Sequence, residues 1–196
     1  GARAVMMEMD NKFAEKCGIC EYEYCGDELR VDIPVEQGDV IVAGNLRFKV
    51  ISLPGHTKCS IGFYLEEYSL LLSSETLGVY DGNKAIMPSF LVSFKDSLES
   101  IDKIVKLKPE RILCPHFGVI EGDAAKYFLE NIKSVSVEVA EFISEKLHQN
   151  IPEEDIIEAV KCRYRRGYIK DVYPDDAVNL NTSIMIKLVE KEFGIL

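Results

Sequence analysis

The first part of the chain alternates apolar and polar residues in the way that is typical of β-strands. Short turn sequences separate the apolar segments; one is Gly44-Asn45, a pair that favours a tight hairpin. The expected strands are Leu29–Ile33, Asp39–Val42, Leu46–Leu53, Ser60–Leu65 and Tyr68–Ser73. We expect these strands to form an antiparallel meander, followed by a loop over residues 79–90.

Beyond residue 92 the apolar residues recur every three or four positions, which predicts helices. Ser93 is a suitable N-cap, with Asp96 three residues later, and Pro109 ends this helix before a short buried strand over Arg111–Cys114. Three further helices are expected over residues 123–148, 153–166 and 176–193. The order of elements predicts an α/β fold with a helical C-terminal extension. It divides the chain into an ambiguous N-terminal segment (1–28), an α/β domain (29–122) and the extension (123–196).

Composition narrows the expected surroundings of the protein. The chain has 196 residues, a hydrophobic content of 47% and a formal net charge of −10, so a folded core and an acidic surface are expected. An acidic surface disfavours nucleic acid and anionic membranes as partners. Neither a secretory signal nor a membrane span is recognisable, and we expect a cytoplasmic protein whose six cysteines are reduced.

Three potential metal ligands follow three predicted strands. His56 lies in Leu53-Pro54-Gly55-His56-Thr57, Glu75 follows the apolar segment that ends at Ser73, and His116 follows Cys114-Pro115. Imidazole and carboxylate groups together suit Zn, Fe or Mn. A histidine at a strand end is also commonly a structural, hydrogen-bonded residue. From spacing alone, a metal site and three structural residues both stay open.

The sequence around these residues resembles the C-terminal half of the metallo-β-lactamase superfamily. The resemblance rests on VISLPGHTKCSIGFYLEEYSLLLSSETLG, a capped helix and KPERILCPHFGVIEG, in the family's order, over residues 29–122. It implies an αββα sandwich with one or two metal ions between its sheets. It also implies that His56 is the histidine of the family's third motif and His116 its last ligand histidine. Glu75 falls where the family usually has a bridging aspartate.

Two departures from the family pattern stand out. Glu75 is one methylene longer than the usual aspartate, so three positions stay open for its carboxylate: bridging two ions, binding one ion, or pointing away. The family signature His-x-His-x-Asp-His normally precedes the Pro-Gly-His-Thr turn, but none of the 55 residues before His56 is a histidine. We therefore expect a C-terminal portion of the fold whose signature segment was lost, rather than a naturally shortened form, and we expect this chain alone to be inactive.

The resemblance implies a metal-dependent hydrolase in the complete protein. Zn is the expected ion, with Fe or Mn as alternatives, and one or two ions would be bound. Metal-bound hydroxide would attack an ester, thioester, lactone or phosphoester of a small-molecule substrate. One alternative is a non-catalytic binding or scaffolding module that keeps the fold; a second is a flavodiiron-like oxidoreductase. A homodimer is compatible with the apolar faces of the C-terminal helices.

Three other features each have a structural and a functional interpretation. Cys17, Cys20 and Cys25 have partial zinc-knuckle spacing, with Cys59 as a conceivable fourth ligand, but free thiols are favoured. The basic run Lys161, Arg163, Arg165 and Arg166 is best explained as a solvated helix end. The tyrosines Tyr22, Tyr24, Tyr164, Tyr168 and Tyr173 are core residues or pocket walls, and the C-terminal helices could cover the mouth of the site.

Overall fold

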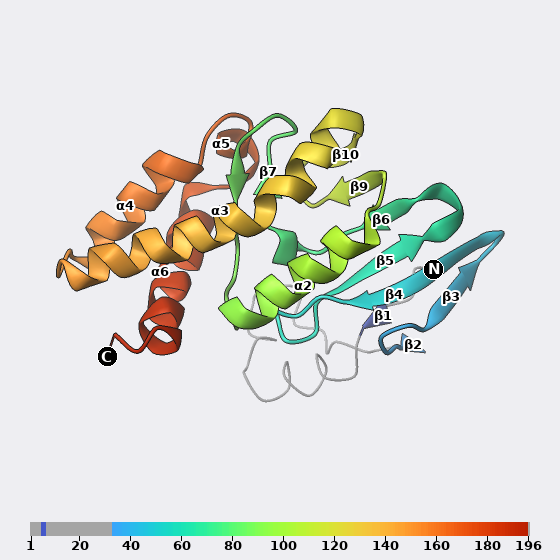
Figure 1. Ribbon diagram of the computed structural model, residues 1–196, viewed down its shortest axis with the longest axis horizontal. Coiled ribbons are helices and arrows are strands. Elements are labelled where there is room, and N and C mark those ends of the chain that lie inside the picture. Colours follow the sequence, from blue (N-terminus) through green and yellow to red (C-terminus); the bar gives the residue numbers. More distant parts are fainter. Residues whose placement is uncertain (1–4, 7–32, 196) are drawn as a thin grey trace.

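A six-stranded sheet carries the candidate site. The computed structural model describes residues 5–6 and 33–195, and the sheet occupies the right-hand half of the view in Figure 1. Its strand order is β10-β9-β6-β5-β4-β3. The strands are β3 (Val40–Ala43), β4 (Leu46–Ser52), β5 (Ile61–Leu65), β6 (Leu70–Leu72), β9 (Arg111–Cys114) and β10 (Gly118–Glu121).

The predicted meander from β3 to β6 is confirmed. Ala43 pairs with Leu46 across the Gly44-Asn45 turn, and Val50, Phe63 and Leu72 are cross-strand neighbours in antiparallel pairs. β6 pairs with β9 in parallel, because the chain returns through a helix before it enters β9. β10, which was not among the expected strands, pairs antiparallel with β9 and forms one edge of the sheet.

The expected first strand takes a different place. Only its end lies within the described residues, as β2 (Ile33–Pro34), which pairs in parallel with β1 (Val5–Met6). This pair is a separate two-stranded sheet, so β2 is not part of the meander. Pro34 lacks the backbone N–H that a longer ladder needs, which favours a short pairing here.

Two helices pack against one face of the large sheet. The longer of them continues into the left-hand half of Figure 1, where the other three described helices lie. The sheet-covering helices are α2 (Phe94–Leu107) and α3 (Gly122–His148); the others are α4 (Glu153–Tyr164), α5 (Ile169–Val172) and α6 (Asp175–Glu192). The side chain of Ser93 accepts a hydrogen bond from the backbone N–H of Asp96, which confirms the predicted cap of α2. Short 3-10 turns, η2 (Glu66–Tyr68) and η3 (Glu75–Leu77), flank β6.

Within the described part of the chain, two hydrophobic clusters share α3. Leu71 and Ile112 of the sheet pack with Ile101 of α2 and with Phe128 and Ile132 from the first half of α3. The second half of α3 packs in another cluster with α4 and α6. The 27 residues of α3 thus span the sheet domain and the helical region without a break.

The prediction of a loop over residues 79–90 is wrong for part of the segment. The segment contains a buried hairpin, β7 (Val79–Tyr80) paired with β8 (Ile86–Met87). Asp81 closes its turn by accepting hydrogen bonds from the backbone N–H groups of Asn83 and Ala85, at 2.8 and 2.9 Å. Each of these strands has only two residues, which is too few to show strand periodicity, and Gly, Asn, Asp and Pro are common in the same segment. The sequence therefore suggested a loop.

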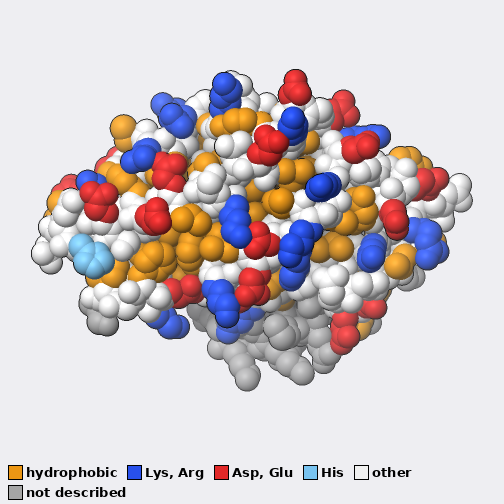
Figure 2. Space-filling view, viewed as in Figure 1, with side chains coloured by type: hydrophobic (Ala, Val, Ile, Leu, Met, Phe, Trp, Pro, Cys, Tyr) orange, Lys and Arg blue, Asp and Glu red, His pale blue; other side chains and the backbone are white. Residues whose placement is uncertain are grey.

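Charges of both signs are interspersed over hydrophobic areas on the face shown in Figure 2. Such mixing gives no extended basic surface for a nucleic-acid backbone on that face. Within the described part of the chain, none of the helices combines the length and the apolar character needed to cross a bilayer.

Candidate metal centre

His56 lies in a turn that presses against the start of α2. Gly55 has a φ of +137°, and a Cβ atom there would meet Ser97 Oγ at 2.1 Å. Its carbonyl oxygen accepts hydrogen bonds from the backbone N–H groups of Leu91, Val92 and Ser93. Glycine is therefore required both by the conformation and by the close approach of the helix. The turn that carries His56 is held on one side by the sheet and on the other by α2.

The imidazole of His56 is oriented by Ser89. Its Nδ1 lies 3.1 Å from the carbonyl oxygen of Ser89 and 2.9 Å from the Ser89 hydroxyl. A carbonyl oxygen only accepts, so the bond to it places a proton on Nδ1. In the neutral imidazole, Nε2 then carries the free lone pair and is available as a ligand. Such a bond from the second ring nitrogen is the usual support of a metal-bound histidine.

Glu75 faces both histidines. Its Oε2 lies 3.6 Å from Nε2 of His56 and 3.5 Å from Nε2 of His116. The neighbouring Thr76 is buried, and its hydroxyl donates a 2.6 Å hydrogen bond to the carbonyl oxygen of Leu53. The turn of Glu75 and the turn of His56 are therefore tied together.

His116 reaches the centre from the turn between β9 and β10. Its φ is +65°, in the left-handed region that costs a non-glycine residue roughly 1–2 kcal/mol. Its ring lies parallel to that of Tyr173, with centroids 6.3 Å apart and planes 10° from parallel. Strained backbone held by its surroundings is common at functional sites and supports a functional role for His116.

The separations fit the ligands of one metal ion. Two ligand atoms about 2.0–2.1 Å from a tetrahedral Zn²⁺ lie roughly 3.3–3.4 Å apart, which is near the observed 3.5 and 3.6 Å. The lone pair of His56 Nε2 also faces a carboxylate oxygen, an arrangement that a cation between them stabilises. Among residues 33–195, however, no group of three or more His, Cys, Asp and Glu side chains is arranged so that it could hold a metal ion. The role of His56, Glu75 and His116 as ligands therefore stays a prediction.

The C-terminal region contributes a fourth side chain. Tyr173, in the connection between α5 and α6, is 4% exposed. Burial, reinforced by the negative charge of Glu75, raises the pKa of Tyr173 to about 12, although hydrogen bonds with Asn181 and Ser89 oppose the shift. Tyr173 is therefore a neutral phenol at neutral pH. Tyr173 was expected either in the core or in a pocket wall, whereas Ser89, which falls in the expected loop, was not among the predicted site residues.

The prediction that the basic run is a solvated helix end is only partly right. Lys161 and Arg165 are only 15% and 16% exposed, and both form ion pairs with Asp175 at the start of α6. Hydrogen bonds that Lys161 donates to Glu158 and Asp175 raise its pKa against the opposing effect of burial. Lys161 and Arg165 lie at the C-terminal end of α4, as expected, but they are mostly buried and tie α4 to α6 instead of facing solvent. Arg163 does match the expectation in being half exposed.

The cysteines supply no thiolate near the centre in the described part of the chain. Cys59 and Cys114 are buried and free, and burial raises the pKa of Cys114 to about 12. Cys17, Cys20 and Cys25 lie outside the described residues, so their predicted role as free thiols stays a prediction. Because a buried neutral thiol is a poor nucleophile, Cys114 acts as a packing residue two positions before His116.

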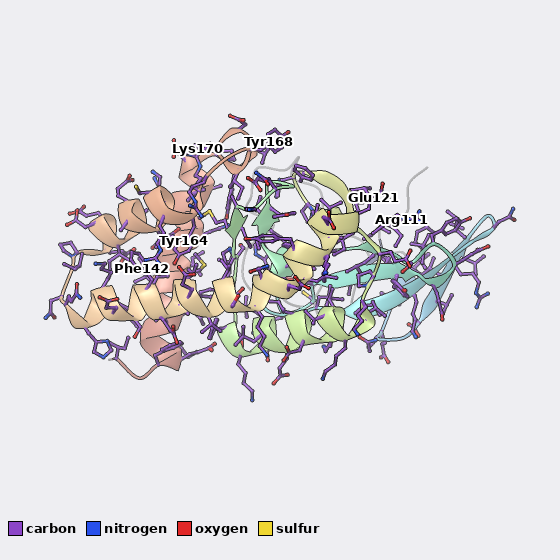
Figure 3. The ribbon with its side chains drawn as sticks, turned by 45° about the horizontal axis from the view of Figure 1, so that its top comes forward. Arg111, Glu121, Phe142, Tyr164, Tyr168 and Lys170 are labelled. Carbon is purple, nitrogen blue, oxygen red and sulfur yellow. The ribbon has the colours of Figure 1, made fainter. Side chains whose placement is uncertain are left out.

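A separate groove of about 720 Å³ lies between the end of α2, the β9–β10 pair and the start of α3. Arg111 and Glu121, labelled side by side in Figure 3, belong to its lining. None of the three metal-ligand candidates lines this groove. It is therefore distinct from the centre.

The geometry agrees with what sequence comparison shows. The family model of the metallo-beta-lactamase superfamily matches residues 8–116. The chain belongs to this superfamily. The match starts ahead of Leu29, where the resemblance of the sequence analysis began, and ends at His116. The metallo-β-lactamase motifs around His56, Glu75 and His116 thus belong to one continuous match.

Solved structures confirm the fold class of this metallo-β-lactamase chain. A metallo-beta-lactamase family protein from Thermus thermophilus is 18% identical and superposes with a TM-score of 0.66. The superposition covers 99% of this chain and 68% of that one. The α/β fold with a helical C-terminal part, predicted from the sequence, therefore occurs as a whole in another member of the family.

Curated relatives of this metallo-β-lactamase chain include hydrolases. An acyl-coenzyme A thioesterase from Gallus gallus is 28% identical over 106 residues, which cover 51% of this chain and 36% of the relative. A hydroxyacylglutathione hydrolase from Chelativorans sp. (strain BNC1) is 31% identical over 87 residues, which cover 44% and 32%. Matches to three curated relatives span 51%, 36% and 32% of those proteins. The names of two of these relatives, a thioesterase and a hydrolase, describe hydrolytic enzymes.

Proposed function

We propose that this chain forms one side of the active centre of a metal-dependent hydrolase, with His56, Glu75 and His116 as metal ligands. The observation that supports the proposal is the approach of both histidine Nε2 atoms to the same oxygen of Glu75, at 3.6 and 3.5 Å. The donor set of two imidazoles and one carboxylate suits Zn²⁺, with Fe or Mn as alternatives.

Each residue has a distinct task in this centre. When bound, the ion acts as a Lewis acid and activates water for hydrolysis. His56 presents Nε2 in a fixed tautomer because Nδ1 is bonded to Ser89. Glu75 supplies negative charge between the two imidazoles. His116 is aimed at the same point by its left-handed backbone and by the ring of Tyr173.

The substrate we favour is a small-molecule thioester. The proposed substrate class also includes esters, lactones and phosphoesters, because such a centre could hydrolyse each of them. Two relatives are named for acyl-coenzyme A and hydroxyacylglutathione, and this favours a thioester among the four. The acidic chain gives no reason to expect nucleic acid or an anionic membrane as partner.

Three ligands are few for such a centre. The sequence contains three histidines, and the third, His148, is at the last turn of α3 with its Nδ1 bonded to the carbonyl oxygen of Ser144. We therefore expect the 196-residue chain to bind one ion weakly and to lack enzyme-like turnover without further donors. The incomplete donor set is the observation that supports the alternative, a non-catalytic binding module.

Zn²⁺ titration of the purified chain by calorimetry tests the proposal. We expect about one ion per chain, with affinity reduced at least about tenfold in His56→Ala and His116→Ala. His148→Ala, which removes the histidine outside the centre, is the matched control and should bind like the wild type. Equal affinity in all four proteins would overturn the ligand assignment, and absence of binding would favour the non-catalytic module. Thiol release from an acyl-coenzyme A thioester, measured in parallel, should stay near the uncatalysed rate; rapid release lost in His116→Ala would overturn the expected inactivity.

A further inference from the structure

The segment between α4 and α6, residues 165–174, folds back onto the candidate metal centre. Gly167 lies against Asp81 so closely that a Cβ atom would be 2.4 Å from the carboxylate Oδ2. Tyr168 meets Phe117, the residue after His116, edge to face at a centroid distance of 5.8 Å. Figure 3 shows Tyr168 and Lys170 at the outer tip of this segment. The segment therefore touches the β7–β8 turn and the His116 turn at once.

Arg165 fixes the course of this segment. Its Nε donates to the carbonyl oxygen of Tyr173 and one terminal nitrogen donates to that of Lys170, both at 2.9 Å. The other terminal nitrogen lies 3.1 Å from the carboxylate of Asp175. A guanidinium that fills three sites in a fixed fork holds backbone better than a flexible ammonium would. The backbone of Tyr173 is therefore anchored directly.

The side chain of Tyr173 contacts His116 directly and is linked to His56 through Ser89. Its ring lies parallel to the imidazole of His116, within the range of favourable aromatic pairs. Its hydroxyl accepts a short hydrogen bond from the side-chain amide of Asn181. The same hydroxyl also interacts with the side chain of Ser89, whose hydroxyl lies 2.9 Å from Nδ1 of His56. One side chain thus contacts one imidazole by its ring face and the support of the other by its hydroxyl.

We propose that Tyr173 is a positioning residue that sets the orientation of both His116 and His56. The ring controls the plane of His116, and the hydroxyl, through Ser89, controls the tautomer and direction of His56. The link to metal affinity rests on the proposed function, whereas the orientation of the two rings does not. An ordered second contact of this kind typically alters metal affinity by about 10–100-fold when it is removed.

Two substitutions separate the two links. Tyr173→Phe keeps the ring and removes the hydroxyl, and Tyr173→Leu keeps apolar volume but removes the aromatic face. Tyr164 is the matched control, because it is also 4% exposed and its hydroxyl is also bonded, to Glu138, away from the centre. Tyr164 packs on Phe142 between α4 and α3, as Figure 3 shows. The controls are Tyr164→Phe and Tyr164→Leu.

Imidazole NMR of histidine-labelled, metal-free protein reads out orientation directly, since the chain has only three histidines. We expect Tyr173→Leu to shift the ring signals of His116, because the ring current of the stacked phenol is lost. Tyr173→Phe should instead change the Nδ1 and Nε2 signals of His56 and leave those of His116 nearly unchanged. The signals of His148 should stay constant in all variants, which also reports that α3 is folded.

Zn²⁺ affinity is measured on the same five proteins. We expect a loss of about 10–100-fold in Tyr173→Leu, a smaller loss in Tyr173→Phe and none in the Tyr164 variants. If the wild type binds Zn²⁺ but both Tyr173 variants keep its affinity and its histidine signals, the positioning role is wrong while the proposed function stands. If the wild type binds no Zn²⁺, the proposed function fails, and the NMR shifts alone decide whether Tyr173 orients the two rings. Unchanged histidine signals in both Tyr173 variants overturn the inference in either case.

Discussion

The hydroxyl of Thr76 donates a 2.6 Å hydrogen bond to the carbonyl oxygen of Leu53, and this bond joins the two turns that carry Glu75 and His56. The backbone N–H of His56 also approaches the same hydroxyl, at 3.4 Å. Thr76 therefore sets the distance between two ligand candidates that lie on separate elements. The spacing of the centre depends on a buried side chain that itself binds no metal.

Replacing Thr76 by valine should loosen the centre without changing its donors. The carbonyl oxygen of Leu53 would lose a buried partner, and we expect the free energy of unfolding to fall by about 1–3 kcal/mol. Zn²⁺ affinity should fall as well, because His56 and Glu75 would no longer be held together. Urea unfolding and calorimetric titration measure the two effects. Thr76→Ser keeps the hydroxyl and should restore both; a Thr76→Val protein with wild-type stability would contradict the role of this bond.

Replacing Gly55 by alanine should be far more damaging than the same change at another turn. At Gly55 a Cβ atom would collide with Ser97 on α2, at 2.1 Å from Oγ and 2.7 Å from Cα. At Gly44 the φ is +62° and nothing lies within 4 Å of the added atom. We expect Gly44→Ala to cost about 1 kcal/mol for its conformation alone, and Gly55→Ala to cost more than about 4 kcal/mol. Thermal melts of the two variants test this contrast, and similar midpoints would refute the close approach of α2.

Arg165→Lys should release the segment that carries Tyr173. Lysine cannot make the three contacts of the guanidinium fork, so backbone amides of residues 169–173 should exchange hydrogen faster, while those of α2 should not. The loss of charged hydrogen bonds should cost about 1.5–3 kcal/mol. Arg163→Lys is the control, because Arg163 is half exposed and pairs with Glu138 at the surface. Exchange by mass spectrometry gives the answer, and equal exchange in the two variants would remove Arg165 from this role.

Tyr80 should make the fold sensitive to alkali. Burial, with a further contribution from Asp81, raises the pKa of Tyr80 from 10.0 to about 12, and its hydroxyl donates a 2.6 Å bond to the carbonyl oxygen of Asn83. A raised pKa means that the folded state favours the protonated phenol. This stabilisation is complete below pH 10 and is lost as the pH rises towards 12. Unfolding free energy should therefore fall more steeply with pH in this range for the wild type than for Tyr80→Phe, and parallel curves would contradict the shift.

The fold was predictable where a pattern repeats locally. The β3–β6 strands follow alternating residues around a Gly-Asn turn, and α2 begins at Ser93 with the side-chain cap that the sequence indicated. Short elements such as the β7–β8 hairpin could not be predicted, because a strand of two residues shows no periodicity. For the site, His56 and His116 stand in recognisable turns. Ser89 gave no comparable signal, since its bond to His56 joins residues 33 positions apart that only the folded chain brings together.

The long helix α3 has a consequence for how the molecule comes apart. Ile132 in its first half packs under the sheet, whereas Val139 and Ile143 in its second half pack with α4 and α6. A continuous helix that belongs to both clusters transmits the melting of either one to the other, because fraying at one end removes the partner of the next turn. The described structure should therefore lose its order in a single cooperative step. The helical region is then no detachable appendage, and a protease cut within α3 would undo the ligand-bearing half as well.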